Sequence, residues 1–103
     1  MRSIAQRARA LEAKFAHDQE ILFKVEAQRN KLIGLWAASL LNKEDPTAYA
    51  STLCQFGVEK PDAIASRLKQ DFESAGLSVS EEAIQSKMVT LLRQAHEAMH
   101  ISQ

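Results

Sequence analysis

The chain has 103 residues and a formal net charge of zero, with 13 basic and 13 acidic residues. A hydrophobic fraction of 46% and a charged fraction of 25% exclude a disordered chain, a collagen-like chain and a disulfide scaffold, and the length indicates one domain. Only three glycines and two prolines are present, and the apolar residues are mostly Ala and Leu. This composition predicts an all-α domain.

The zero net charge conceals an asymmetry along the chain. Residues 1–14 contain four basic residues and one acidic residue, a net charge of +3. The rest of the chain contains 9 basic and 12 acidic residues, a net charge of −3. A short Arg-rich segment therefore precedes a mildly acidic body.

The first predicted element is a long helix over residues 3–42, closed by Asn42. At 100° per residue its apolar positions fall on one stripe, formed by Ile4, Ala8, Leu11, Phe15, Leu22, Val25, Ile33, Trp36 and Leu40. The stripe is narrow up to about residue 20, which suits one partner surface, and it broadens from Ile21 onward, which suits a bundle interior. Gly34 and the alanines that follow it would let another helix approach closely.

This first helix is longer than the rest of the chain can cover. Forty residues span ~60 Å, whereas the next-longest predicted helix spans ~33 Å. We therefore expect residues 1–18 to form a mobile basic amphipathic arm that becomes ordered on a partner, and residues 19–103 to form the bundle. The alternative is a frayed terminus with no role.

Three shorter helices are predicted to follow, over residues 46–56, 61–75 and 79–100. Asp45-Pro46 is typical of an N-cap followed by the first helical residue, and Ser78 and Glu81 have capping-box spacing before the last helix. Because the connections are short, neighbouring helices should be antiparallel, and a small up-down four-helix bundle is the economical fold.

Gly57 and Gly76 are predicted to end the second and third helices as left-handed residues. Each lies between apolar residues that are spaced for the hydrophobic contact of a Schellman motif. These apolar pairs are Leu53 with Val58 and Phe72 with Leu77.

Neither a membrane span nor a secretory signal is predicted. No apolar run approaches the ~20 residues of a transmembrane helix, and charges interrupt every window of the first 31 residues. The Arg-rich start has some likeness to a mitochondrial transit peptide, but its pattern continues unbroken into the body. The single cysteine, Cys54, cannot form an internal disulfide, so an intracellular, cytoplasmic location is expected.

One motif suggests metal chemistry. The run from His96 to His100 matches H-E-x-x-H, in which two histidines on one helix face bind zinc and the Glu acts as general base. Only three residues follow it, so a third ligand downstream is missing, and histidines at a helix C-terminus are favourable to the helix dipole. A zinc hydrolase therefore stays an alternative, and we expect no catalytic residue and no metal site.

Other binding chemistry is not predicted. Cys54 lies among apolar residues and is expected to be a small buried residue rather than a nucleophile. No glycine-rich phosphate-binding motif is present, so no cofactor is expected. Four basic residues without clustered aromatics do not predict a nucleic-acid partner.

Several runs of the sequence together resemble a known family. These runs are Arg7–Asp18, Phe23-Lys24, Ala27–Ala38, Ile84–Met88 and Leu91. They resemble the zeta subunit family, small bacterial inhibitors of the F-type ATP synthase. The resemblance implies a four-helix bundle with a mobile N-terminal inhibitory segment and no enzymatic activity, and we expect a monomer when the protein is free.

The resemblance also implies a partner and a mechanism. The segment would insert into a catalytic interface of the synthase head, formed by the alpha, beta and gamma subunits, and block rotation during ATP hydrolysis. The chain would then be associated with the inner membrane only through the synthase, without inserting into it. The expected partner-binding residues are Ile4, Arg7, Ala8, Arg9, Leu11, Lys14 and Phe15, the apolar ones as anchors in a groove and the basic ones against acidic rims.

The sequence departs from the family in this segment. Strongly inhibitory members resemble Phe-Asp-Asp-Arg-Glu-Arg where this chain has Ile4-Ala5-Gln6-Arg7-Ala8-Arg9, so three acids are replaced by neutral residues. The alternative function is therefore a helical protein-binding module without strong inhibitory activity.

Overall fold

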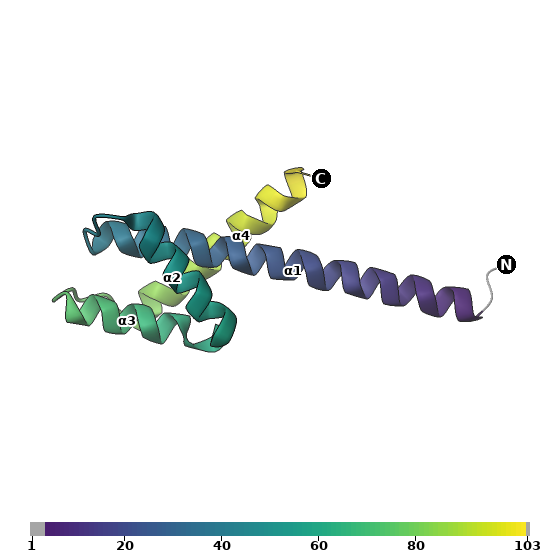
Figure 1. Cartoon of the computed structure of the whole chain (residues 1–103), viewed down its shortest axis with the longest axis horizontal. Helices are drawn as coiled ribbons and strands as arrows, with labels where there is room; N and C mark the ends of the chain where they lie inside the picture. Colours follow the sequence, from purple (N-terminus) through teal and green to yellow (C-terminus); the bar gives the residue numbers. More distant parts are fainter. Residues whose placement is uncertain (1–3, 103) are drawn as a thin grey trace.

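The structure, a computed structural model, describes residues 4–102, and within them it contains helices and no strand. The elements are α1 (Ile4–Leu40), α2 (Pro46–Glu59), the 3-10 turn η1 (Pro61–Ala63), α3 (Ile64–Ser74) and α4 (Glu81–Ser102). The all-α class and the long first helix predicted from the sequence are confirmed (Figure 1).

Helix α1 is the axis of the molecule. Its 37 residues span ~55 Å, most of the 64 Å length of the molecule. α2 lies across the C-terminal half of α1, and α4 packs against both α1 and α3 (Figure 1). The N-terminal half of α1 and the C-terminal end of α4 project from this bundle in diverging directions (Figure 1).

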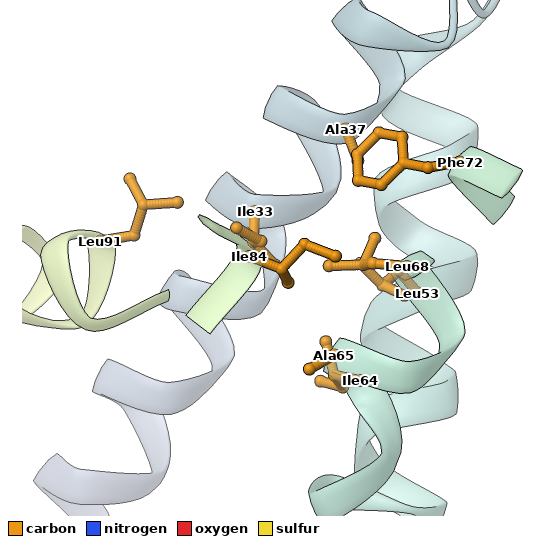
Figure 2. Packing of buried hydrophobic residues seen from close by; sticks show 9 residues of the cluster. All are labelled: Ile33, Ala37, Leu53, Ile64, Ala65, Leu68, Phe72, Ile84 and Leu91. Atoms are coloured by element: carbon orange, nitrogen blue, oxygen red, sulfur yellow. The ribbon is translucent and has the colours of Figure 1, made fainter. Parts of the chain in front are cut away.

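The core lies where the four helices meet (Figure 2). Its buried members are Ile33, Ala37, Leu53, Ile64, Ala65, Leu68, Phe72, Ile84 and Leu91. The Trp36 ring meets the Phe72 ring edge-on, with 5.7 Å between ring centroids, a geometry worth about 0.5–1.5 kcal/mol beyond the buried area. Because each large buried side chain contributes about 1.5–3 kcal/mol relative to exposure, this cluster anchors the C-terminal half of α1.

A polar contact joins α2 to α3 beside the core. The Tyr49 hydroxyl donates a hydrogen bond of 2.6 Å to Oδ2 of Asp71. Arg67 Nε lies 3.3 Å from the same oxygen, so the carboxylate of Asp71 has two donors. The Lys43 ammonium lies over the Tyr49 ring, 5.4 Å from its centroid.

The connection between α1 and α2 has the predicted local structure. Asn42 has a φ of 55°, and the N–H of Lys43 donates a 3.0 Å hydrogen bond to the carbonyl of Ala38, which is the Schellman pattern. Asp45 caps α2, since its Oδ1 accepts a 3.1 Å hydrogen bond from the N–H of Ala48. The expected roles of Asn42 and Asp45 are confirmed.

The prediction that Gly76 ends α3 is also confirmed. Its φ is 76°, and the N–H of Leu77 donates to the carbonyl of Phe72 over 2.9 Å. This bond and the 3.0 Å bond from the N–H of Gly76 to the carbonyl of Glu73 complete a Schellman motif.

The prediction that Gly57 ends α2 is wrong. The helix continues to Glu59, and Gly57 is buried inside it. A Cβ at this position would lie 2.6 Å from Cδ1 of Ile64 and 2.9 Å from Nδ2 of Asn30. The glycine therefore serves the close approach of the Ile64 and Asn30 side chains, and Val58, which is 72% exposed, makes no Schellman contact.

The predicted starts of the last two helices also need correction. α4 begins at Glu81 rather than residue 79, because Ser80 and not Ser78 is its cap: Oγ of Ser80 accepts a 3.0 Å hydrogen bond from the N–H of Ala83. The segment predicted as one helix from residue 61 opens with η1 before α3 begins at Ile64.

Candidate functional site

The N-terminal half of α1 is unusually exposed. Every side chain that the structure describes between residues 7 and 20 is exposed, and the first buried side chain along α1 is that of Val25. Among the described residues, therefore, no other helix buries a side chain of this segment, in contrast to the C-terminal half of α1.

The predicted partner-binding residues lie along this exposed segment. Arg7, Ala8, Arg9, Leu11 and Lys14 are all exposed, and Leu11 presents 69% of its surface to solvent. Ile4 and Phe15 were predicted as further anchors; their side chains lie outside the described ones, although their backbone is helical.

The positions around α1 divide these residues between two sides. Leu11 and Leu22 are eleven residues apart, so their directions around the axis of α1 differ by only about 20°. Arg7 and Lys14 lie about 40° and 60° from Leu11, both on the same side of it, whereas Arg9 lies about 160° away. Arg9 is therefore on the opposite side of α1 from the apolar stripe, a distinction the linear sequence pattern did not make.

The basic residues of the segment are available to a partner. Within the part of the chain that the structure describes, Arg7, Arg9 and Lys14 have no ion-pair partner, and the first ion pair along α1 joins Glu20 to Lys24 over 3.1 Å. The sequence predicted a net charge of +3 at this end of the chain. The three basic side chains that the structure describes there are not neutralised by ion pairs within the described residues.

A polar contact marks the place where α1 enters the bundle. Asn30 is buried, with 8% of its surface exposed, and its Oδ1 accepts a 3.1 Å hydrogen bond from Nε of Arg29. Its amide also lies against Gly57 of α2. The bond from Arg29 satisfies one acceptor of this buried amide, and leaving such a group unpaired would cost about 1–3 kcal/mol.

A second surface, which sequence reasoning missed, lies between α1, α2 and α4. We call it the Cys54 groove: an open depression of about 530 Å³ that is lined by Phe23, Lys24, Ala27, Gln28, Lys31, Cys54, Ala95, Ala98 and Met99. Phe23 is 64% exposed and lies off the apolar stripe of α1. An aromatic residue outside the predicted stripe was the one signal in the sequence that could have indicated it.

Cys54 itself is half-buried rather than fully buried. Burial raises the pKa of its thiol above the ordinary value, and the nearby Lys31 opposes this shift. A raised pKa leaves less thiolate at neutral pH, and the thiolate is the nucleophilic form. This supports the packing role expected from the sequence over a nucleophilic one.

The H-E-x-x-H run lies near the end of α4. His96 and Glu97 are exposed, and the side chain of His100 lies outside the described ones. Among the residues that the structure describes, no three His, Cys, Asp or Glu side chains are grouped so that they could hold a metal ion.

Comparisons with known proteins support one family. A family model described as ATPase inhibitor subunit zeta matches residues 1–98, which is nearly the whole chain and includes both the exposed half of α1 and the Cys54 groove apart from Met99. A search of curated proteins found no match. None of the described helices is long and apolar enough to span a lipid bilayer.

Proposed function

The chain belongs to the ATPase inhibitor subunit zeta family, and on this basis we propose that it inhibits an F-type ATP synthase by inserting the N-terminal part of α1 into a catalytic interface of the synthase head. The family indicates an inhibitory subunit rather than an enzyme. The partner in this proposal is the head formed by the alpha, beta and gamma subunits, and the synthase is what brings the chain to the membrane.

The observation that carries this proposal is the exposure of half of a 37-residue helix. An amphipathic helix binds a groove through apolar anchors on one face and charges at the rim. Leu11 provides such an anchor in this proposal, and Arg7 and Lys14 lie together on one side of it, with no ion-pair partner among the described residues. The proposed anchors Ile4, Ala8 and Phe15 would extend the same stripe towards the partner.

The proposed arm comprises residues 1–18 and the bundle residues 19–103. Helices shorter than about 12–15 residues are marginal in water, so an arm with no tertiary contacts gains its stability from the partner. Ordering the arm costs binding free energy, which makes the strength of inhibition depend on the helix propensity of the arm as well as on its contacts. The arm acts as a wedge and performs no chemistry.

A second candidate is a helical binding module that inhibits weakly. The observation in its favour is the absence of acidic side chains from residues 4 to 11, so no ion pair can form there with basic residues of a partner. In this case the chain would bind the synthase but leave most of the ATP hydrolysis intact.

The test measures binding and ATP hydrolysis by purified synthase heads with and without this protein. Tight binding with inhibition supports the first function, binding without inhibition supports the second, and no binding contradicts both. Deletion of residues 2–14 should abolish inhibition while cooperative unfolding of the bundle is retained. A loss of cooperative unfolding in this variant would contradict the division into arm and bundle.

A further inference from the structure

The Cys54 groove lies on the opposite side of α1 from the arm's apolar stripe. Leu11 and Ala27 are sixteen residues apart, which is about 160° around the helix. A partner that takes up the stripe of the arm therefore leaves the groove accessible. The groove needs its own explanation, since its apolar lining includes an aromatic residue with 64% of its surface in solvent.

The lining of the groove is apolar with a basic edge. Its apolar lining comes from all three helices: Phe23 and Ala27 of α1, Cys54 of α2, and Ala95, Ala98 and Met99 of α4. Among the described residues that line it, the two charged ones are both basic, Lys24 and Lys31, and none is acidic. An occupant with an apolar face and acidic flanks is complementary to both properties.

The spacing of the two lysines adds a geometric requirement. Lys24 and Lys31 are seven residues apart on α1, so they point to the same side and are ~10.5 Å apart, two helical turns. Carboxylates two turns apart on an approaching helix have the same separation. The Lys24 ammonium is paired with Glu20 in an exposed i, i+4 contact, which is weak enough to be exchanged for an intermolecular one.

We propose that the Cys54 groove binds an amphipathic helix with acidic flanks that belongs to the ATP synthase, so that the bundle holds the enzyme at a second point besides the arm. This inference rests on the proposed function for the identity of the partner. It assigns the bundle a binding role of its own: the groove adds affinity to that of the arm, and only the arm inhibits.

Cys54 provides a local probe of occupancy, because it is the only cysteine in the chain and lines the groove. Its thiolate can be alkylated with iodoacetamide, with loss of iodide, in the full-length protein alone and in complex with purified synthase heads. We expect the heads to slow alkylation at least tenfold. The double variant Lys24→Glu/Lys31→Glu should raise the dissociation constant about tenfold and flatten its salt dependence, while saturating amounts of it still inhibit.

The matched control is Lys69→Glu. Lys69 also belongs to an exposed i, i+4 pair, with Glu73 at 3.4 Å, but it lies on α3 away from the groove. This control should leave both the dissociation constant and the protection of Cys54 unchanged, and circular dichroism should show that all variants retain their helices.

The outcomes separate this inference from the proposed function. A stable, inhibited complex in which Cys54 is alkylated as fast as in the free protein overturns the groove proposal and leaves the inhibitor function standing. No binding to the heads overturns both. Protection that grows with the concentration of the protein alone would make a second copy the occupant, and protection by vesicles containing anionic lipid would make it a membrane; either result overturns the proposal.

Discussion

Gly34 of α1 lies so close to Ala50 of α2 that a Cβ on Gly34 would be 2.7 Å from the Cα of Ala50 and 2.9 Å from its Cβ. Both residues are buried, and the contact lies where the two helices cross. The close packing of α1 on α2 therefore requires a residue without a side chain at position 34. This contact lies in the part of α1 that α2 and α4 cover.

Gly34→Ala should destabilise the bundle. Alanine adds up to about 1 kcal/mol of helix propensity, but overpacking costs about 1–3 kcal/mol, and the obstructing atom belongs to the backbone of α2, which cannot rotate away. We expect a net loss of about 1–2 kcal/mol in the free energy of unfolding by urea. Ser39→Ala, at an exposed position of the same helix, should be neutral or slightly stabilising; equal stability of Gly34→Ala and the wild type would contradict the tight crossing.

Phe72→Ala should strongly destabilise the bundle. Phe72 is fully buried at the centre of the core, and truncation of a buried Phe costs about 3–5 kcal/mol, a large part of the stability of a small domain. The emission of Trp36, the only tryptophan, reports the loss because its ring contacts Phe72. Phe23→Ala is the control, since Phe23 is exposed and its truncation should change stability by less than about 0.5 kcal/mol.

Tyr49 should make stability fall at alkaline pH. Burial, and then the hydrogen bond to Asp71, raise the pKa of Tyr49 well above its ordinary value of 10.0. The unfolded chain therefore loses the phenolic proton first, so the stabilisation is complete below about pH 10 and is lost progressively above it.

Two measurements check this effect. Tyr49 is the only tyrosine, so the ultraviolet absorbance of tyrosinate follows its titration directly in the folded protein. Tyr49→Phe should cost about 1 kcal/mol at neutral pH and show a weaker decrease in stability above pH 10 than the wild type. A tyrosinate titration centred at the ordinary pKa would contradict the contact with Asp71.

Leu11→Glu should impair inhibition without affecting folding. Burying a leucine is worth about 1.5–3 kcal/mol, so losing this anchor should raise the concentration for half-maximal inhibition about tenfold or more. Val89→Glu is the matched control: Val89 is similarly exposed, at 65% against 69% for Leu11, but lies on α4. Thermal unfolding should place both variants within about 0.5 kcal/mol of the wild type, and equal loss of inhibition in the two would contradict a specific role for the arm.

Features that depend on neighbours in the chain could be predicted from the sequence. The cap at Asp45 and the left-handed residues Asn42 and Gly76 are local, since each is fixed by hydrogen bonds within five residues. The excess length of α1 followed from counting residues. Gly57 was misassigned because a glycine can serve either a left-handed turn or a close contact, and only the position of Ile64 decides between them.

The exposed half of α1 and the Cys54 groove differ in the same respect, namely whether the sequence alone could predict them. The exposed half of α1 could be predicted, because an apolar stripe longer than its neighbours must remain uncovered. The Cys54 groove could not, since it exists only because three helices separated in sequence bring Phe23, Cys54 and Met99 together. Helical periodicity describes one helix at a time and cannot show where two of them diverge.

The continuity of α1 has a mechanical consequence. No glycine or proline interrupts residues 4–33, so whenever the arm is helical its apolar stripe keeps a fixed angle around α1 relative to the Cys54 groove. One inserted residue after position 18 would rotate the stripe by about 100° relative to the groove, whereas seven would restore the phase to within about 20° and lengthen the reach by ~10.5 Å. The number of residues between the two surfaces thus sets both the angle between them around α1 and the distance between them along it. It therefore also sets how far the bundle lies from the site that the arm occupies.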